Sequence, residues 1–144
     1  MKTSSAPPLL PANRSMPEST VIPVLAYPDV RAAVEWLGQA FGFTERLRIG
    51  DHRAQLCFNG GAVIITGPVK VAPDATHAIL VRVPDADSHH ERARKYGAMI
   101  LHALADHQYG ERQYSATDPG GHIWTFSQTI ADADPRTWGG TLHE

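Results

Sequence analysis

The sequence predicts an α+β fold in which a strand, a helix and three further strands occur twice. Tyr27-Pro28-Asp29 follows an apolar run over residues 21–26, and Val83-Pro84-Asp85 follows another over residues 78–81, 56 positions later. Each Pro-Asp pair precedes a helical pattern that ends at a glycine. Residues 49–66 and 109–126 then match at an offset of about 60, and each block reads as a strand, a glycine turn and a strand. These observations divide the chain into two βαβββ modules, residues 21–66 and 77–128.

The first module opens with a strand over residues 21–26, after which Asp29 is suited to cap a helix by accepting free backbone N–H groups. The predicted helix carries one apolar stripe and stops at Gly42. The stripe consists of Val30, Ala33, Val34, Leu37, Ala40 and Phe41. A short strand near residues 45–48 and the hairpin over residues 49–66 complete the module.

The second module repeats this order from the strand over residues 78–81 and the cap Asp85. Its helix stripe runs through Ala86, His89 or His90, Ala93 and Tyr96 to Gly97, a residue type favoured just past helix ends. A short strand near residues 99–102 and the hairpin over residues 109–126 follow. Residues 67–76, with two prolines, form the linker between the modules.

The two ends of the chain lack this periodicity. Residues 1–20 hold four prolines and four serines and are predicted to form a mobile tail, and residues 129–144 a C-terminal tail. Trp138 is expected to dock on the domain or on a partner subunit, or to remain a partly exposed tail aromatic. No apolar run has the length of a signal-peptide core or a membrane span, so a cytoplasmic protein is expected.

Composition excludes several functional classes. With 144 residues and 42% hydrophobic content, the chain fits one domain that needs no disulfide or structural metal. A formal net charge of −2 offers no basic surface for nucleic acid or anionic lipid. Cys57 is the single cysteine and has no histidine beside it in sequence, which favours a reducing compartment and a packing role.

The order of these motifs resembles the vicinal oxygen chelate superfamily, which includes glyoxalase I, extradiol dioxygenases, fosfomycin-resistance transferases and bleomycin-resistance proteins. The resemblance covers residues 21–128. It is carried by Pro23 with Tyr27-Pro28-Asp29, Ala40-Phe41-Gly42-Phe43, Val83-Pro84-Asp85, Ala93, Gly97-Ala98, Tyr109-Gly110-Glu111-Arg112 and Asp118-Pro119-Gly120-Gly121-His122-Ile123-Trp124. It implies a curved mixed sheet around a cavity with the helices outside, and a homodimer. Metal-dependent members place four ligands, one on the first and last strand of each module.

The four implied ligand positions fall on Ile22, Ile65, Ala78 and Thr125. Aliphatic side chains have no lone pair to offer, and one threonine hydroxyl is a poor ligand for a metal that prefers His, Cys or carboxylate. We therefore expect no metal and no other cofactor. A non-standard site built from His52, His122 and Glu111 is the alternative. His77, next to Ala78, points away from the cavity because strand side chains alternate.

The same alternation assigns a mostly apolar cavity wall, in which Arg82 is suited to an anionic group on a ligand. The wall comprises Ile22, Val24, Ala26, Val63, Ile65, Ala78, Leu80, Arg82, Ile123, Thr125 and Ser127. Trp124 and Phe126 then face the helices. On the middle strands two alternatives stay open: either Gln55 and Ser115 face the ligand, or Arg112 and Tyr114 do. The candidate ligand-binding residues are thus Ile22, Val24, Gln55, Ile65, Arg82, Arg112, Tyr114 and Thr125.

The leading hypothesis is a metal-independent protein of the bleomycin-resistance type that sequesters an antibiotic or metabolite in a dimer cavity. No catalytic residue is assigned. The alternative is a lyase, isomerase or dioxygenase with a non-standard site that uses Glu111 or a cavity histidine. A third hypothesis is an interaction protein that functions through its dimer surface. His89 and His90 are expected on a solvated helix face.

Overall fold

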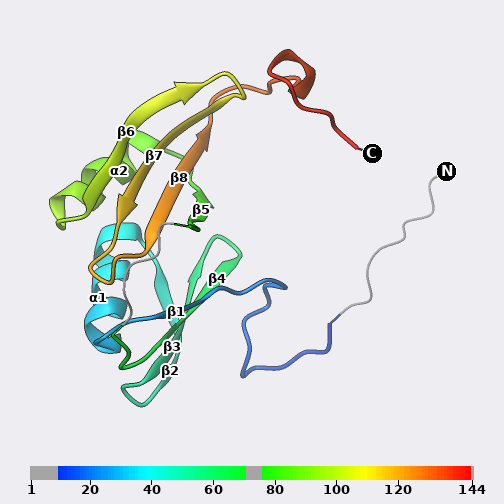
Figure 1. The fold of residues 1–144 in the computed structure, drawn as a ribbon. Helices are drawn as coiled ribbons and strands as arrows, with labels where there is room; N and C mark the ends of the chain where they lie inside the picture. Colours follow the sequence, from blue (N-terminus) through cyan, green and yellow to red (C-terminus); the bar gives the residue numbers. More distant parts are fainter. Residues whose placement is uncertain (1–9, 71–75, 144) are drawn as a thin grey trace.

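Each predicted module forms its own four-stranded sheet in the computed structural model, which describes residues 10–70 and 76–143. The first module consists of β1 (Val24–Ala26), α1 (Val30–Phe41), β2 (Thr44–Ile49), β3 (Arg53–Phe58) and β4 (Gly61–Thr66). The second consists of β5 (Ile79–Arg82), α2 (Ala86–Lys95), β6 (Met99–His107), β7 (Glu111–Thr117) and β8 (Ile123–Thr129). The strand orders, β1-β4-β3-β2 and β5-β8-β7-β6, are the same, which confirms the predicted repeat (Figure 1).

The helix boundaries follow from the residues that predicted them. The Asp29 carboxylate accepts from the Ala32 N–H, and that of Asp85 accepts from the Ser88 N–H, both at 3.1 Å. Gly42 ends α1 in the left-handed region, with φ 87°. All six residues of the predicted α1 stripe are buried, so the helix packs on its sheet through that stripe.

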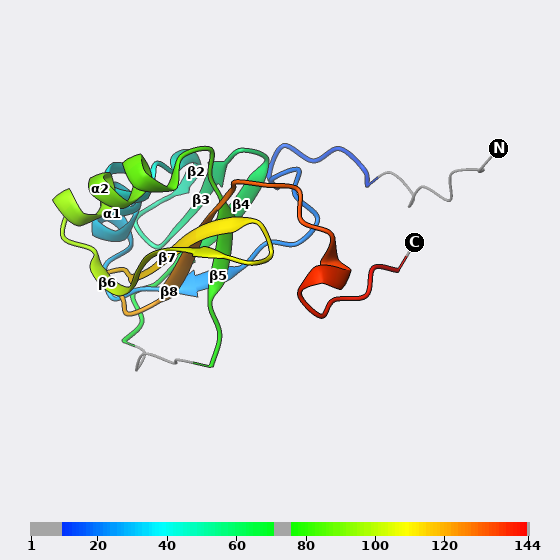
Figure 2. The same cartoon turned by 90° about the horizontal axis from the view of Figure 1, so that it is seen from above.

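Both helices lie on the same side of the two sheets, which leaves each sheet a second face that we call the open face (Figures 1 and 2). Trp124 and Phe126 of β8 are fully buried on the helix side, as predicted. Ala54 and Leu56 on β3 and Tyr114 and Ala116 on β7 are buried on the same side, which decides between the two alternatives for the middle strands. Gln55, Gln113 and Ser115 therefore occupy the open faces.

The assignment of Val63 and Ile65 to the same wall as Val24 was wrong. In the parallel pair β1–β4, Val24 lies opposite Ile64, and Ile65 is fully buried on the helix side. The matching pair in the second sheet joins Leu80 to Thr125. Ile64 is thus the counterpart of Thr125, at an offset of 61 instead of 60. A one-residue slip moves every side chain of a strand to the other face.

The two modules meet through their helix ends. The Trp36 indole N–H of α1 donates to the carbonyl of Tyr96, at 2.8 Å, just past α2. In return, the Arg92 guanidinium of α2 donates to the carbonyls of Gln39 at 2.6 Å and Gly38 at 3.1 Å. Each helix thus supplies donors for carbonyls near the other's C-terminus, where intrahelical partners run out.

His89 also joins the modules, although the sequence placed it on a solvated face. Its Nε2 lies 3.0 Å from the Phe41 carbonyl and its Nδ1 lies 2.5 Å from the Tyr114 hydroxyl, so the neutral ring donates to the carbonyl and accepts from the phenol. Burial lowers the pKa of His89. The hydrogen bond to Phe41 raises this pKa and the positive charge of Arg92 lowers it, and the net shift is downward.

This lowered pKa predicts a pH dependence of stability. In the unfolded chain His89 takes up a proton at about pH 6.5, whereas in the folded protein it does so only at lower pH. The stabilisation is therefore complete above that pH and is lost as the pH falls toward the folded pKa. We expect the free energy of unfolding, measured by urea titration, to fall less between pH 7 and pH 5 in His89→Gln than in the wild type. Equal pH slopes in both proteins would contradict this.

A second junction is built around the buried carboxylate of Asp118, in the loop between β7 and β8. One oxygen accepts from the Tyr27 hydroxyl and the Trp124 indole N–H, the other from the backbone N–H groups of Gly120 and His122. Burial, and then the neighbouring carboxylate, raise the pKa of Tyr27 far above its usual value, so the phenol remains a donor. A Cβ on Gly120 would lie 2.6 Å from the Tyr27 ring, so no side chain fits there.

Both chain ends contact the domain. Residues 13–19, which we call the N-terminal strap, bond to the first sheet, whereas the sequence predicted a mobile tail over residues 1–20; residues 1–9 lie outside the described range. Trp138 packs its ring against Tyr109, with centroids 5.6 Å apart. In the part of the chain that the structure describes, no helix is long and apolar enough to cross a membrane.

Candidate functional site

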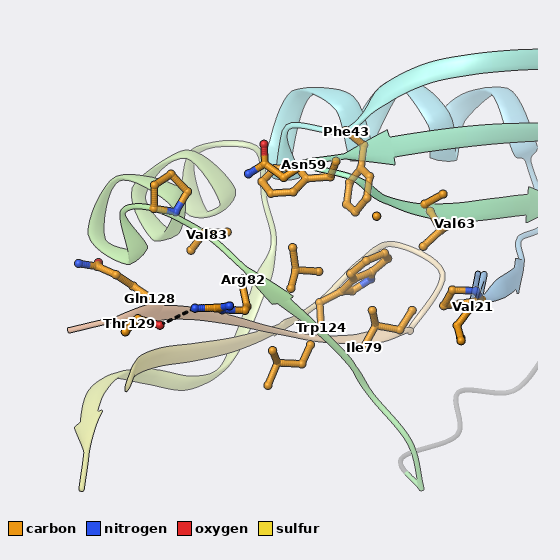
Figure 3. Close-up of a pocket in the computed structure, with 17 residues that line it drawn as sticks. Val21, Phe43, Asn59, Val63, Ile79, Arg82, Val83, Trp124, Gln128 and Thr129 are labelled. Atoms are coloured by element: carbon orange, nitrogen blue, oxygen red, sulfur yellow. Dashed lines mark hydrogen bonds between the residues drawn. The ribbon is translucent and has the colours of Figure 1, made fainter. Parts of the chain in front are cut away.

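A cavity of about 720 Å³ lies between the two modules, where the β3–β4 hairpin of the first faces β5 and β8 of the second (Figure 3). Such a volume is typical of small-molecule sites. Its lining comprises Val21, Pro23, Phe43, Phe58, Asn59, Gly61, Ala62, Val63, Ile79, Leu80, Val81, Arg82, Val83, Pro84, Trp124, Gln128 and Thr129. Most of these residues are apolar, so the cavity suits an apolar ligand body.

Aromatic rings from both modules meet at this cavity. Phe43, just after α1, lies between Phe58 of β3 and Trp124 of β8, with ring centroids at 5.5 and 5.4 Å. Phe43 and Trp124 are buried and Phe58 is half-buried. These tilted and edge contacts fix the relative position of the two modules at the cavity.

Arg82 supplies the positive charge of the cavity. Its Nη2 donates to the Thr129 hydroxyl at 2.9 Å, and it is the one charged residue in this lining within the described ranges. Gln128 is less available because its carbonyl oxygen accepts from the Ala86 N–H at the start of α2. A guanidinium has five N–H donors, so Arg82 retains donors for an anionic ligand group.

A row of polar side chains continues from Arg82 across the open face of the second sheet. Ser127 donates to Glu111 at 2.6 Å, and Gln113 donates to Ser127 at 2.9 Å. Burial opposes ionisation of Glu111, but hydrogen bonds from Ser127 and Thr129 and the charge of Arg82 outweigh it and lower the pKa of this carboxyl. A carboxylate with a lowered pKa is a weak general base at neutral pH. This weakens the case for Glu111 as the base of an enzyme.

A second cavity, of about 510 Å³, lies on the open face of the second sheet. Ser115 and Thr125 line it and share a hydrogen bond of 2.8 Å. Leu101, His102, Ala103, Ala105, His107, Gln113 and Tyr114 complete the lining. This cavity shares no lining residue with the first, and β7 and β8 contribute the polar side chains of Gln113, Ser115 and Thr125 to it.

The candidate residues on or next to the first and last strands of each module do not form one wall. Arg82 lines the larger cavity and Thr125 the second. Ile22 lies between two lining residues without lining either cavity, and Val24 is exposed on the open face. Ile65 is buried in the core for the reason of register given above.

The three candidates of the middle strands are also dispersed. Gln55 is buried on the open face of the first sheet, beneath the N-terminal strap. Arg112 forms ion pairs with Asp87 and Asp106, outside both cavities. Tyr114 borders the second cavity, but its hydroxyl points to His89 on the helix side. Arg112 and Tyr114 are therefore not brought to the larger cavity.

The donor chemistry does not fit the metal site that the resemblance implies. On the four strands concerned, the open-face residues nearest the implied positions offer hydroxyls and a guanidinium, whereas borderline metals take His, Cys or carboxylate. These open-face residues are Val24, Ile64, Thr66, Leu80, Arg82, Ile123, Thr125 and Ser127, and the implied positions Ile22 and Ala78 precede β1 and β5. Across residues 10–70 and 76–143, no three His, Cys, Asp or Glu side chains gather closely enough to hold an ion. The alternative set His52, His122 and Glu111 is thus not assembled.

Several lining residues were missed because the sequence argument looked for one face of one sheet. Ile79, Val81 and Trp124 have helix-facing parity, yet they line the space between modules. Asn59 lies at the tip of the β3–β4 hairpin with a positive φ of 46°. The Asn59-Gly60 turn was the available signal, since ligand contacts are often carried by loops.

Comparisons with known proteins agree with this geometry. A family model described as the Glyoxalase/Bleomycin resistance protein/Dioxygenase superfamily matches residues 20–126. The crystal structure of TioX from Micromonospora sp. ML1 is similar, with 36% identity, a TM-score of 0.65, and coverage of 78% of this chain and 99% of that one. The fosfomycin resistance protein FosX from Listeria monocytogenes shares the fold at 15% identity and a TM-score of 0.66, covering 78% and 94%. An uncharacterised protein of Mycobacterium tuberculosis is 26% identical over 133 residues, which are 81% of this chain and 78% of that one.

Proposed function

The chain belongs to the glyoxalase/bleomycin resistance protein/dioxygenase superfamily, and from this premise we propose that it binds a small organic molecule without a metal and without turning it over. The observation that carries the proposal is the apolar cavity of about 720 Å³ with Arg82 in its lining. Binding requires only such a pocket and a few placed polar groups. A sequestering role toward an antibiotic or a metabolite fits this site.

The ligand class follows from the lining. The apolar and aromatic walls favour a hydrophobic, planar body, and the free donors of Arg82 favour a carboxylate, phosphonate or phenolate on it. Native mass spectrometry of the purified protein, followed by denaturation, would identify what the cavity retains. We expect one small organic anion per chain; protein that never retains or takes up such a molecule would contradict the proposal.

Metal independence is tested separately. Elemental analysis of protein purified without chelator is expected to show no stoichiometric divalent metal, because the open-face residues offer poor ligands. One tightly held divalent ion per chain would contradict this part of the proposal.

The role of Arg82 predicts a charge-specific effect. For the probe pair naphthalene-2-carboxylate and naphthalene-2-carboxamide, Arg82→Met is expected to weaken binding of the carboxylate roughly tenfold to a hundredfold and to leave the carboxamide nearly unchanged, since only the anion gains a charge-assisted hydrogen bond. Isothermal titration calorimetry measures both. Arg94→Met, at an exposed residue paired with Glu91 on α2, is the control and should change neither affinity. Equal losses for both probes would contradict the assigned role.

We further propose a homodimer. Val24 on β1, Leu80 on β5 and Met99 on β6 expose more than half of their surface in the single chain, and β1 and β5 are edge strands that pair with a strand on one side in the described part of the chain. A second copy would cover both features. Light scattering at micromolar concentration is expected to give twice the 15.7 kDa mass of the chain; a monomer under these conditions would contradict the proposal.

A further inference from the structure

The N-terminal strap makes three side-chain hydrogen bonds to the first sheet. Arg46 of β2 donates to the Arg14 carbonyl at 2.9 Å, and Gln55 of β3 donates to the Ser15 carbonyl at 2.7 Å. Further along, the Ser19 hydroxyl donates to the carbonyl of Gly60 at the hairpin tip, at 2.8 Å. The strap therefore runs along β3, from Gln55 to the β3–β4 turn.

The strap and its receptor are both shaped for this contact. Asn13 turns the strap by accepting from the N–H groups of Ser15, through its side chain, and Met16, through its carbonyl, both at 3.0 Å. On the sheet, Arg46 also donates to the side-chain oxygen of Gln55 at 2.6 Å, which leaves the Gln55 amide nitrogen for the Ser15 carbonyl. Two linked side chains thus bind two successive backbone carbonyls.

Burial on this face shows what the strap covers. Gln55 and Ile64 are 3% and 5% exposed, although they lie on the face away from the helices. Pro17 of the strap is itself buried. In Figure 1 the blue N-terminal segment lies on the side of the first sheet opposite α1, and Figure 2 agrees.

The internal repeat shows what this face would be without the strap. Ser115 and Thr125, the counterparts of Gln55 and Ile64, line the second cavity of about 510 Å³. The strap therefore occupies, in the first module, the position that forms a cavity in the second.

We propose that the N-terminal strap is a detachable cover and that its release exposes a second binding face in the first module. The exposed face would combine the apolar side chain of Ile64 with the freed donors of Arg46 and Gln55, so it suits an amphiphilic organic anion. A few partly exposed hydrogen bonds oppose the ordering of seven residues, so release costs far less than unfolding of the domain. This inference does not depend on the function proposed for the larger cavity.

Cys57 provides a reporter for strap release. It is the single cysteine of the chain, it is half-buried, and it lies on the open face of β3 between Gln55 and the hairpin tip at Gly60. We expect a maleimide to label the folded full-length protein slowly, at a rate set by release of the strap, and to label the urea-unfolded protein fast.

Two variants weaken docking from opposite sides. Pro17→Gly removes the buried ring of the strap without touching the sheet, and Arg46→Met removes the donor to Arg14. Each is expected to raise the labelling rate of the folded protein about tenfold. Pro17→Gly, which keeps the Arg46 guanidinium, should also increase the fluorescence of 8-anilinonaphthalene-1-sulfonate, an amphiphilic anion. Arg48→Met is the matched control, because Arg48 lies on the same strand but its guanidinium donates to the Gly50 carbonyl and to Asp51, away from the strap.

The outcomes separate clearly. Faster labelling in Pro17→Gly and Arg46→Met, at an unchanged urea midpoint and with wild-type labelling in Arg48→Met, supports the cover. Fast labelling of the wild type, equal rates in all four proteins, or an equal rise in the control would overturn it. Because Pro17 lies outside both sheets, its variant remains informative even if Arg46→Met fails to fold.

Discussion

Asp118→Ala is expected to lower the free energy of unfolding by roughly 3 kcal/mol, because four donors lose their acceptor inside the protein. Asp118 is only 5% exposed. Its carboxylate accepts from the backbone of its own loop, from the indole of Trp124, and from the phenol of Tyr27 in the other module. Its removal therefore disturbs the β7–β8 loop and the junction between modules together.

Urea unfolding followed by tryptophan fluorescence measures this loss. Tyr27→Phe removes only the contact between modules and is expected to cost about 1 kcal/mol. Asp51→Ala, at an exposed ion pair with Arg48, is the control and should stay within about 0.5 kcal/mol of the wild type. A loss in Asp118→Ala no larger than that of the control would show that the carboxylate does not hold the junction.

Phe41→Ala is expected to be as damaging, with a loss of roughly 3–5 kcal/mol. The Phe41 ring is fully buried at the end of α1, with ring centroids 4.9 Å from Trp36, 5.5 Å from Trp124 and 4.7 Å from Phe126. It thus packs against both modules. A cavity at this position removes apolar contacts that no neighbouring side chain can restore without moving a helix.

The same urea titration measures the effect, and Tyr96→Ala is a suitable comparison. Tyr96 is also aromatic and caps the C-terminal end of α2, but it is 40% exposed, so its truncation should cost far less than that of Phe41. Similar losses in the two variants would contradict the assignment of Phe41 to the centre of the core.

The repeat and its helices could be predicted because their signals are local. Asp29 and Asp85 mark helix starts through their own backbone contacts, and the α1 stripe records which side is buried. The two β-α-β-β-β modules and the orientation of Trp124 and Phe126 are also confirmed, because they too depend on local signals. Alternation along one strand was sufficient there.

Local signals did not predict which side chains of β4 point toward the helices and which lie on the open face. The hairpin glycines align at an offset of 60, but Ile64 matches Thr125 at 61, and one residue decides which side chains meet a ligand. The pattern of polar and apolar residues did not reveal that the second hairpin is one residue longer between these paired positions.

The burial of His89 and the larger cavity depend on how the modules pack. The α2 sequence is polar around most of its surface, so nothing within it shows that His89 meets Phe41 and Tyr114. Likewise, Asn59 and Arg82 are distant in sequence and come to one cavity only through the junction. Such contacts follow from tertiary structure, which periodicity does not encode.

The helix ends at the junction record a divergence between the two halves. Trp36 and Arg92 occupy equivalent places in the repeat, and each donates to carbonyls at the end of the opposite helix. Here one half offers an indole with a single donor and the other a guanidinium with several, so the halves have become complementary instead of interchangeable. Two copies of either module would present the same donor twice at this junction, so neither module can replace the other there.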